Sequence, residues 1–276
     1  MTRFILLAAT AAIAATAAVP AAADITTFAN YSGIGGANMY WLRTGTSFSA
    51  VGTPAQVAAS RASATATAGG RFFTIATPTS ITAGAVASKF TFLNPVLYAL
   101  GSLDAAYSFD ATATPGSVAQ TAGSFAYQPI VSGTFSFIYT GVSDITVNHV
   151  IYRTGSNLLS ATFTGGTIAG QTGATSGSAT ASTSVGGETI TYTSDFIDFS
   201  RTTDQDLSIS LSSITRGLNA GPFQALRSFA TTTTGSFSTD PLPTLTSATP
   251  EPASWALLIT GFGLVGAARR GRRVPA

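Results

Sequence analysis

The chain has 276 residues, of which 45% are hydrophobic and only 9% are charged, and it contains no cysteine, so disulfides and thiol nucleophiles are excluded. Its formal net charge of +2 would favour an anionic partner, but five of the 13 basic residues lie in the two terminal segments described below. Residues 24–249 carry eight basic and ten acidic residues, and this net charge of −2 leaves nucleic-acid binding without support.

Residues 1–23 have the layout of a secretory signal peptide. Arg3 gives a cationic start, an apolar run extends from Phe4 to Val19, and an A-x-A sequence ends at Ala23. This layout predicts export through the Sec machinery, with cleavage between Ala23 and Asp24. The alternative is an uncleaved N-terminal anchor, which the alanine-rich, weakly hydrophobic run disfavours.

Residues 24–239 are expected to form one extracytoplasmic β-rich domain. Apolar and polar residues alternate with a period of two in several short runs, as in half-buried strands. The runs are Phe90–Phe92, Phe135–Tyr139, Ile145–Ile151, Leu159–Phe163, Ile190–Tyr192 and Leu207–Leu211, with later strands expected around Phe229 and Phe237. Turns are expected at Gly69-Gly70, Gly165-Gly166 and Gly186-Gly187. The fold class is therefore all-β, an antiparallel sandwich or jelly-roll-like body. Within this domain, helix is expected only at Pro54–Ala62 and in a short turn near Pro222–Arg227.

The last 37 residues are expected to lie outside this domain. Residues 240–249 contain prolines and read as an extended linker. The segment 250–276 follows, with an uncharged apolar run from Trp255 to Ala268 and then Arg269, Arg270, Arg272 and Arg273. An apolar run closed by a cationic cluster predicts a single membrane helix, with the arginines as a stop-transfer signal on the cytoplasmic side. The run is short for a span, and a buried core helix is the alternative.

The start of this segment carries a family resemblance. Pro250, Glu251 and Pro252 are followed by Trp255 and Ala256, then by the Gly-rich apolar run and the arginine cluster. This order resembles the PEP-CTERM sorting domain in its PEPxxWA variant. The resemblance covers about a tenth of the chain. It implies an exosortase substrate of a Gram-negative bacterium that makes exopolysaccharide: a protein held transiently in the inner membrane, processed, and then delivered to the cell surface or extracellular matrix.

The remaining residues with chemical potential form no recognisable catalytic set. His149 is the only histidine, and it is expected mid-strand as a structural residue on the face of Ile145, Val147 and Ile151. No G-x-S-x-G motif occurs. Four acidic residues gather late in the chain and offer oxygen ligands for Ca²⁺, but without an EF-hand spacing they are expected to be solvated turn carboxylates: Asp195, Asp198, Asp204 and Asp206. No cofactor or metal site is assigned.

Aromatic residues leave one further possibility open. Tyr40 and Trp41, beside a Gly-rich segment, are the best candidates for a sugar-stacking platform, although core packing is the favoured interpretation. Tyr31, Tyr98 and Tyr107 are the other candidates.

Two hypotheses follow. The favoured one is a non-enzymatic exported protein of the cell surface or exopolysaccharide matrix, with exosortase as its processing partner and exopolysaccharide as an expected partner. The alternative is a secreted carbohydrate-binding module or a glycoside hydrolase that uses a carboxylate pair. A third reading is a permanently membrane-anchored protein.

Overall fold

The computed structural model describes residues 25–47, 49–77 and 80–246. Within these residues the chain forms one α-helix, α1 (Pro54–Thr67), one 3-10 turn, η1 (Tyr98–Leu100), and strands joined by loops. The strands are β1 (Thr26–Gly33), β2 (Met39–Thr44), β3 (Gly69–Thr77), β4 (Ser80–Ala83), β5 (Val86–Phe92), β6 (Ser102–Ala113), β7 (Gln120–Ala122), β8 (Phe125–Pro129), β9 (Ser132–Tyr139), β10 (Ile145–Val147), β11 (Val150–Tyr152), β12 (Asn157–Thr164), β13 (Thr167–Gln171), β14 (Gly177–Ser182), β15 (Thr189–Thr193), β16 (Ile197–Asp198), β17 (Asp204–Ser212), β18 (Phe229–Asp240) and β19 (Thr244–Leu245). The all-β class is confirmed.

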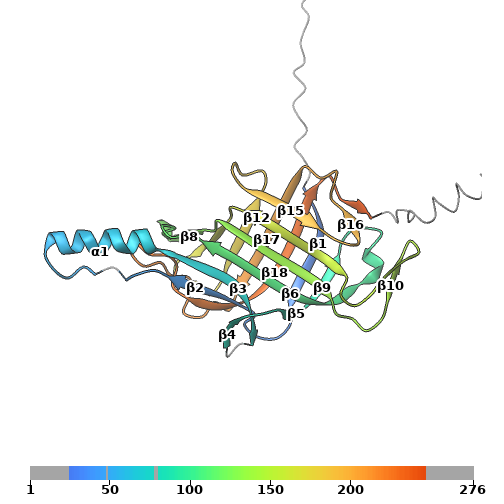
Figure 1. Cartoon of the computed structure of the whole chain (residues 1–276), viewed down its shortest axis with the longest axis horizontal. Coiled ribbons are helices and arrows are strands. Elements are labelled where there is room, and N and C mark those ends of the chain that lie inside the picture. The colour runs from blue at the N-terminus through green and yellow to red at the C-terminus, as the bar shows by residue number, and fades with distance from the viewer. Residues whose placement is uncertain (1–24, 48, 78–79, 247–276) are drawn as a thin grey trace, which may run out of the picture.

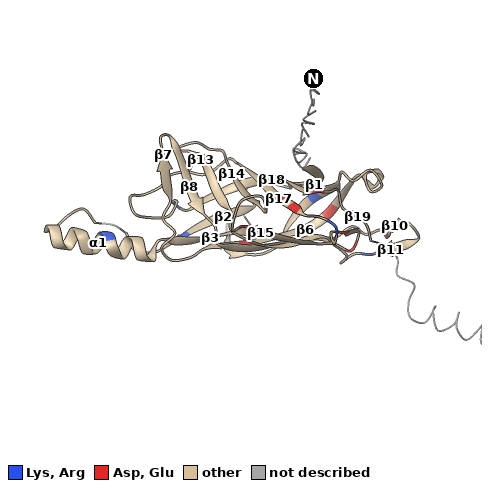
Figure 2. Cartoon of the chain, turned by 90° about the horizontal axis from the view of Figure 1, so that it is seen from above, with Lys and Arg blue, Asp and Glu red and all other residues tan. Residues whose placement is uncertain are grey.

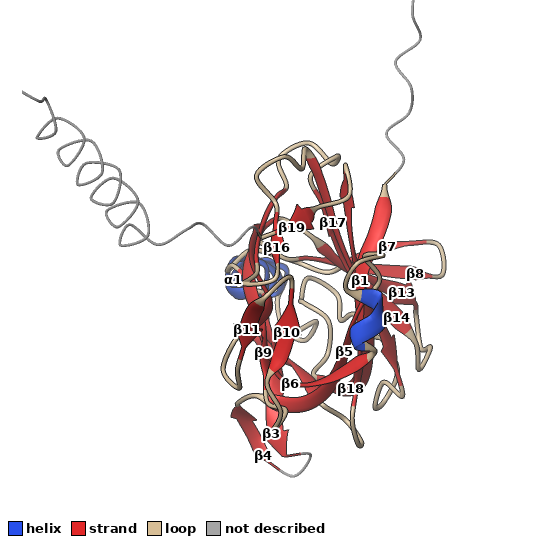
Figure 3. Cartoon of the chain, turned by 90° about the vertical axis from the view of Figure 1, so that its right-hand side faces the viewer, coloured by secondary structure: helices blue, strands red, loops and turns tan. Residues whose placement is uncertain are grey.

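Most strands belong to a single antiparallel sheet that branches at its two longest strands. One side of β6 pairs with β9, and its other side pairs first with β5 and then with β3. In the same way, β18 pairs with β17 on one side and with β1 and β2 on the other. Because β5 also pairs with β1 and β3 with β2, the two branches join, and the sheet doubles back on itself. Figure 3 shows the two resulting layers, with β9 and β6 in one and β18, β14, β13 and β8 in the other.

The space between the layers is filled by the alternate side chains of each strand. Along β6, every second residue from Leu103 to Ala113 is buried, whereas the intervening residues face solvent. Tyr107 stacks on Phe137 of β9, with ring centroids 4.4 Å apart. Phe237 of β18 reaches across to Phe135 of β9, at 5.0 Å. Since β9 and β18 do not pair, this ring contact joins the two layers through the core.

The helix α1 projects from one end of the body (Figure 1). It begins where expected because Thr53 forms a capping box, in which its hydroxyl accepts from the Gln56 backbone N–H and the Gln56 side chain accepts from the Thr53 N–H. It runs to Thr67, five residues beyond the expected end at Ala62. Ala64 is its one buried residue, so the body packs against little of its surface.

Two expectations about local structure were wrong. The run Ile145–Ile151 is a hairpin of β10 and β11, because Asn148 and His149 both have positive φ and form a two-residue turn. His149 is therefore exposed at the tip, and Ile151 lies on the face opposite Ile145. Gly69 and Gly70 form no turn either and instead begin β3.

The first part of the expected linker 240–249 is packed on the body. Residues 244–245 form β19 and pair with β16, and the Thr246 N–H donates to the Phe196 carbonyl. The Asn94 side chain donates to the Pro243 carbonyl, and Leu242 packs against the core. Apolar Leu242 and Leu245 thus hold this stretch against the fold. The signal peptide, its cleavage site and the segment 250–276 lie outside the described residues.

Candidate functional site

The residues predicted to direct sorting are not among those described. They are Ala23 and Asp24 at the cleavage site, Pro250, Glu251, Pro252, Trp255 and Ala256 in the motif, and Arg269, Arg270, Arg272 and Arg273 in the stop-transfer cluster. Within residues 25–47, 49–77 and 80–246, no helix is long and apolar enough to cross a bilayer.

Tyr40 and Trp41, the best candidates for sugar stacking, do not form an exposed platform. Tyr40 is half-buried, with its ring centroid 6.2 Å from that of Phe73. Trp41 is 0% exposed, and its indole N–H donates to the Leu226 carbonyl at 3.0 Å. Gly70 makes room for this ring, since a Cβ at that position would lie 2.3 Å from Trp41 Cζ2. Tyr31 and Tyr107 are buried as well, so core packing is confirmed for these three residues. Tyr98 is 62% exposed, but it lies alone on η1.

The acidic residues late in the chain are spread over loops and strands rather than converging. Asp195 accepts from the Asn157 backbone N–H at 2.7 Å. The Ser200 N–H and hydroxyl donate to Asp198 and lower its pKa. Asp204 lies opposite Asp240 on the neighbouring strand, and one buried oxygen of Asp206 has no hydrogen-bond partner. Among the described residues, no three His, Cys, Asp or Glu side chains are grouped so that they could hold a metal ion.

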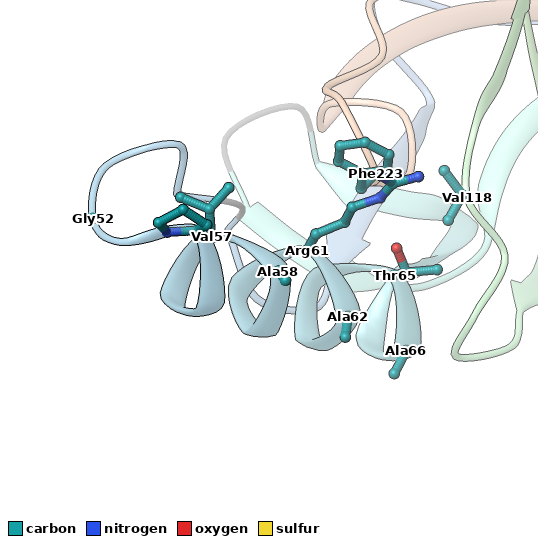
Figure 4. Close-up of a pocket in the computed structure, with 10 residues that line it drawn as sticks. Gly52, Val57, Ala58, Arg61, Ala62, Thr65, Ala66, Val118 and Phe223 are labelled. Carbon is teal, nitrogen blue, oxygen red and sulfur yellow. The ribbon is translucent and has the colours of Figure 1, made fainter.

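A cleft lies between α1 and the loop that carries Phe223 (Figure 4). It has a volume of ≈ 900 Å³ and is lined mainly by small apolar side chains of α1, including Ala58, Ala62 and Ala66, with Val118 on the far side. Arg61 extends from α1 so that its guanidinium lies 4.2 Å from the centre of the Phe223 ring. With one cation and no acid in its lining, this cleft offers no general acid–base pair.

A second feature is the outward face of the layer that contains β18. Cross-strand partners place the outward residues of seven strands in two neighbouring rows, which we call the polar face. Row one is Lys89, Ser32, Thr234, Ser210, Ser178, Ala169 and Tyr127, and row two is Thr91, Asn30, Ser236, Ser208, Thr180, Thr167 and Pro129. None of these residues is buried, whereas their strand neighbours Leu207, Ile209 and Ala179 lie in the core.

The end of the polar face near β5 is hollowed into a groove of ≈ 380 Å³. Its lining includes the row residues of β5, β1, β18 and β17, so hydroxyl and amide groups dominate it. Lys89 is the one charged residue in this lining, and its ammonium lies 2.6 Å from the Asp104 carboxylate. The groove therefore offers hydrogen-bond donors and acceptors with little net charge.

The other end of the polar face carries an exposed aromatic pair. Phe125 and Tyr127 lie two residues apart on β8 and point outward, with exposed fractions of 48% and 36%. Their ring centroids are 6.4 Å apart and their planes are inclined by 29°. Figure 2 shows that the surrounding strands β7, β8, β13 and β14 carry no charged residue. This pair could not be predicted from sequence, because strands that alternate apolar and polar residues look the same whether the apolar side chains are exposed or buried.

Comparison of the chain with protein-family models, with curated proteins and with solved structures finds no match.

Proposed function

We propose that the chain is an exported, non-enzymatic protein of the cell surface or exopolysaccharide matrix, sorted through its C-terminal segment. The observation that carries the proposal is the order of Pro250-Glu251-Pro252, Trp255-Ala256, the apolar run and the arginine cluster. An apolar segment stopped by four guanidinium groups would hold the chain in the inner membrane while an exosortase acts on the motif.

The architecture of the body is compatible with this role. Among the described residues, β19 is the last strand and ends at Leu245, shortly before Pro250, so the proposed signal would follow the strands of the body. The body itself is an antiparallel sandwich in this proposal, with its two layers packed through the ring contacts of β9 and β18. A low-charge surface rich in Ser and Thr suits residence in a hydrated polymer matrix.

The hydrolase alternative gains no support from the described carboxylates. Asp204 and Asp240 form the pair that the strand register places directly opposite each other, but neither lines the α1 cleft or the polar groove. Asp104 and Asp110 are engaged in ion pairs with Lys89 and Arg71. A glycosidase would need two carboxylates facing each other across a substrate cleft.

The sorting proposal is tested by replacing Pro250, Glu251 and Pro252 together with Ala in the producing cell. The matched control is Ser254→Ala, a change at one of the two variable positions within the motif. We expect the triple variant to remain unprocessed in the membrane fraction, whereas the control reaches the surface or medium as the wild type does. Normal fractionation of the triple variant would refute sorting through this motif.

Intact mass and terminal peptide mapping separate the remaining alternatives. A mature species that starts at Asp24 and ends between Pro250 and Trp255 is the expected product. A species in the membrane that still contains Arg269 to Arg273 would instead show a lasting anchor.

A further inference from the structure

The outward face of the layer that contains β18 brings two features together. One is the polar groove, and the other is the exposed pair of Phe125 and Tyr127. The cross-strand register places Tyr127 in the same row as groove residues Ser32, Thr234 and Ser210. Seven strands at about 4.8 Å spacing give each row a length of about 29 Å along the curved sheet.

The hydroxyl groups of the groove are free to bind a ligand. In the part of the chain that the structure describes, no Ser, Thr or Asn side chain of the two rows makes a hydrogen bond to another protein group, although the flanking pairs on the same strands do. Ser212 and Thr232 are joined at 2.7 Å, and Thr27 and Ser238 at 3.0 Å. The rows therefore keep their donor and acceptor capacity available.

We propose that the polar face binds a neutral polysaccharide chain. The groove hydroxyls and Asn30 would exchange hydrogen bonds with sugar hydroxyls, and the rings of Phe125 and Tyr127 would pack against the apolar C–H face of a sugar ring. A neutral polymer fits because Lys89 is the one charged residue of the rows and is already paired with Asp104. A strongly anionic polymer would find no unpaired cation there.

This inference rests on the proposed function, because a protein of the exopolysaccharide matrix would meet polysaccharide at high local concentration. Its chemistry is separate from sorting, because no residue of the polar face belongs to the C-terminal segment. The two proposals can therefore fail independently: one is measured with purified protein and the other by fractionation of cells.

The test is affinity electrophoresis of the full chain in detergent, through native gels that contain dextran, hydroxyethylcellulose or alginate. We expect at least one of the two neutral polymers to retard the protein. The variant Phe125→Ala/Tyr127→Ala should bind that polymer about tenfold more weakly. The variant Ser210→Ala/Thr234→Val should bind it about three- to tenfold more weakly, because it removes two hydroxyls with little change of shape.

Matched controls lie elsewhere on the surface. Tyr98→Ala removes an exposed aromatic ring outside the rows, and Thr162→Val removes an outward hydroxyl from β12 on the other layer. Both should be retarded as the wild type is. Circular dichroism and thermal unfolding of each variant show whether its fold is retained.

Three outcomes would overturn the proposal. The first is that neither dextran nor hydroxyethylcellulose retards the protein, whether or not alginate does. The second is equal weakening by the control variants. The third is a polar face occupied by a second copy of the chain, shown by light scattering as a dimer that Phe125→Ala/Tyr127→Ala dissociates while polymer binding stays unchanged. Normal polymer binding together with failed sorting of the Pro250 variant would support both proposals.

Discussion

The contact between Gly70 and Trp41 allows a sharp test of how the core is packed. Replacing Gly70 with Ala would place a Cβ 2.3 Å from Trp41 Cζ2 and 2.7 Å from Cη2, where ordinary carbon contacts are about 3.5–4.0 Å. The indole ring must therefore move by more than about 1 Å. Such a movement also strains its hydrogen bond to the buried Leu226 carbonyl.

Overpacking of a core costs about 1–3 kcal/mol, and loss of a buried hydrogen bond costs about 1–3 kcal/mol. Alanine recovers about 0.5–1 kcal/mol because glycine is unfavourable within a strand. We therefore expect Gly70→Ala to lower the free energy of unfolding by about 1–5 kcal/mol. Urea unfolding followed by far-UV circular dichroism measures this change.

A double-mutant cycle with Trp41→Phe identifies the cause. Phenylalanine lacks the benzo atoms that meet the new Cβ, so Gly70→Ala should cost less than about 1 kcal/mol in that background. The control is Gly186→Ala, because no atom lies within 4 Å of a Cβ at this exposed glycine. It should change stability by less than about 1 kcal/mol. Equal costs of Gly70→Ala in both backgrounds would refute the proposed contact.

Two further predictions concern ionisation. Burial raises the pKa of Tyr31 to about 12, from 10.0, with hydrogen bonds to Thr233 and Tyr107 opposing the shift. The folded state therefore favours the neutral phenol. The contribution of Tyr31 to the free energy of unfolding should be fully present below pH 10 and should fall by about 3 kcal/mol as the pH rises from 10 to about 12. Tyr31→Phe should show a smaller alkaline loss in urea unfolding at each pH, and an unchanged pH profile would contradict this account. Asp204 and Asp240 lie directly opposite each other, so Asp204→Asn should raise stability by about 0.2–1 kcal/mol at low ionic strength and by less in 1 M NaCl. Thermal unfolding at both salt levels checks this, and a gain that does not depend on salt would point to another cause.

The fold class could be predicted from sequence because the large apolar residues alternate with polar ones. β17 is the clearest case, since Leu207, Ile209 and Leu211 are all buried. Strands such as β14 escaped prediction because their buried positions hold alanines, which contrast weakly with serine and threonine. The hairpin at His149 was predicted as one strand because its two-residue turn, Asn148-His149, contains no glycine.

The candidate site was harder to predict for a related reason. Trp41 and Tyr127 are both aromatic residues in strands that alternate with a period of two, yet one is buried and the other exposed. Which face of a strand lies inside depends on how the whole sheet doubles back, and local sequence does not contain that information. The sorting motif is different, because its meaning depends on residue identity and order rather than on tertiary contacts.

A repeated pattern of hydroxyl groups does not by itself make a binding face. The other layer also carries outward Ser and Thr in register, such as Thr134 opposite Thr162 and Thr162 opposite Thr191. Two of its neighbouring pairs are satisfied internally, since Ser108 bonds to Ser136 and Thr164 to Thr189, each at 2.7 Å. Thr134, Thr162 and Thr191 make no side-chain hydrogen bond to any described residue, so unpaired hydroxyls also occur on that layer. What distinguishes the polar face is that its unpaired hydroxyls line a groove and share a row with an exposed aromatic ring. For this reason Thr162→Val is the informative control. If threonine occurs in these rows only because it favours β-strands, Thr162→Val and Thr234→Val should have the same effect on polymer binding. If the polar face binds polysaccharide, only Thr234→Val should weaken binding.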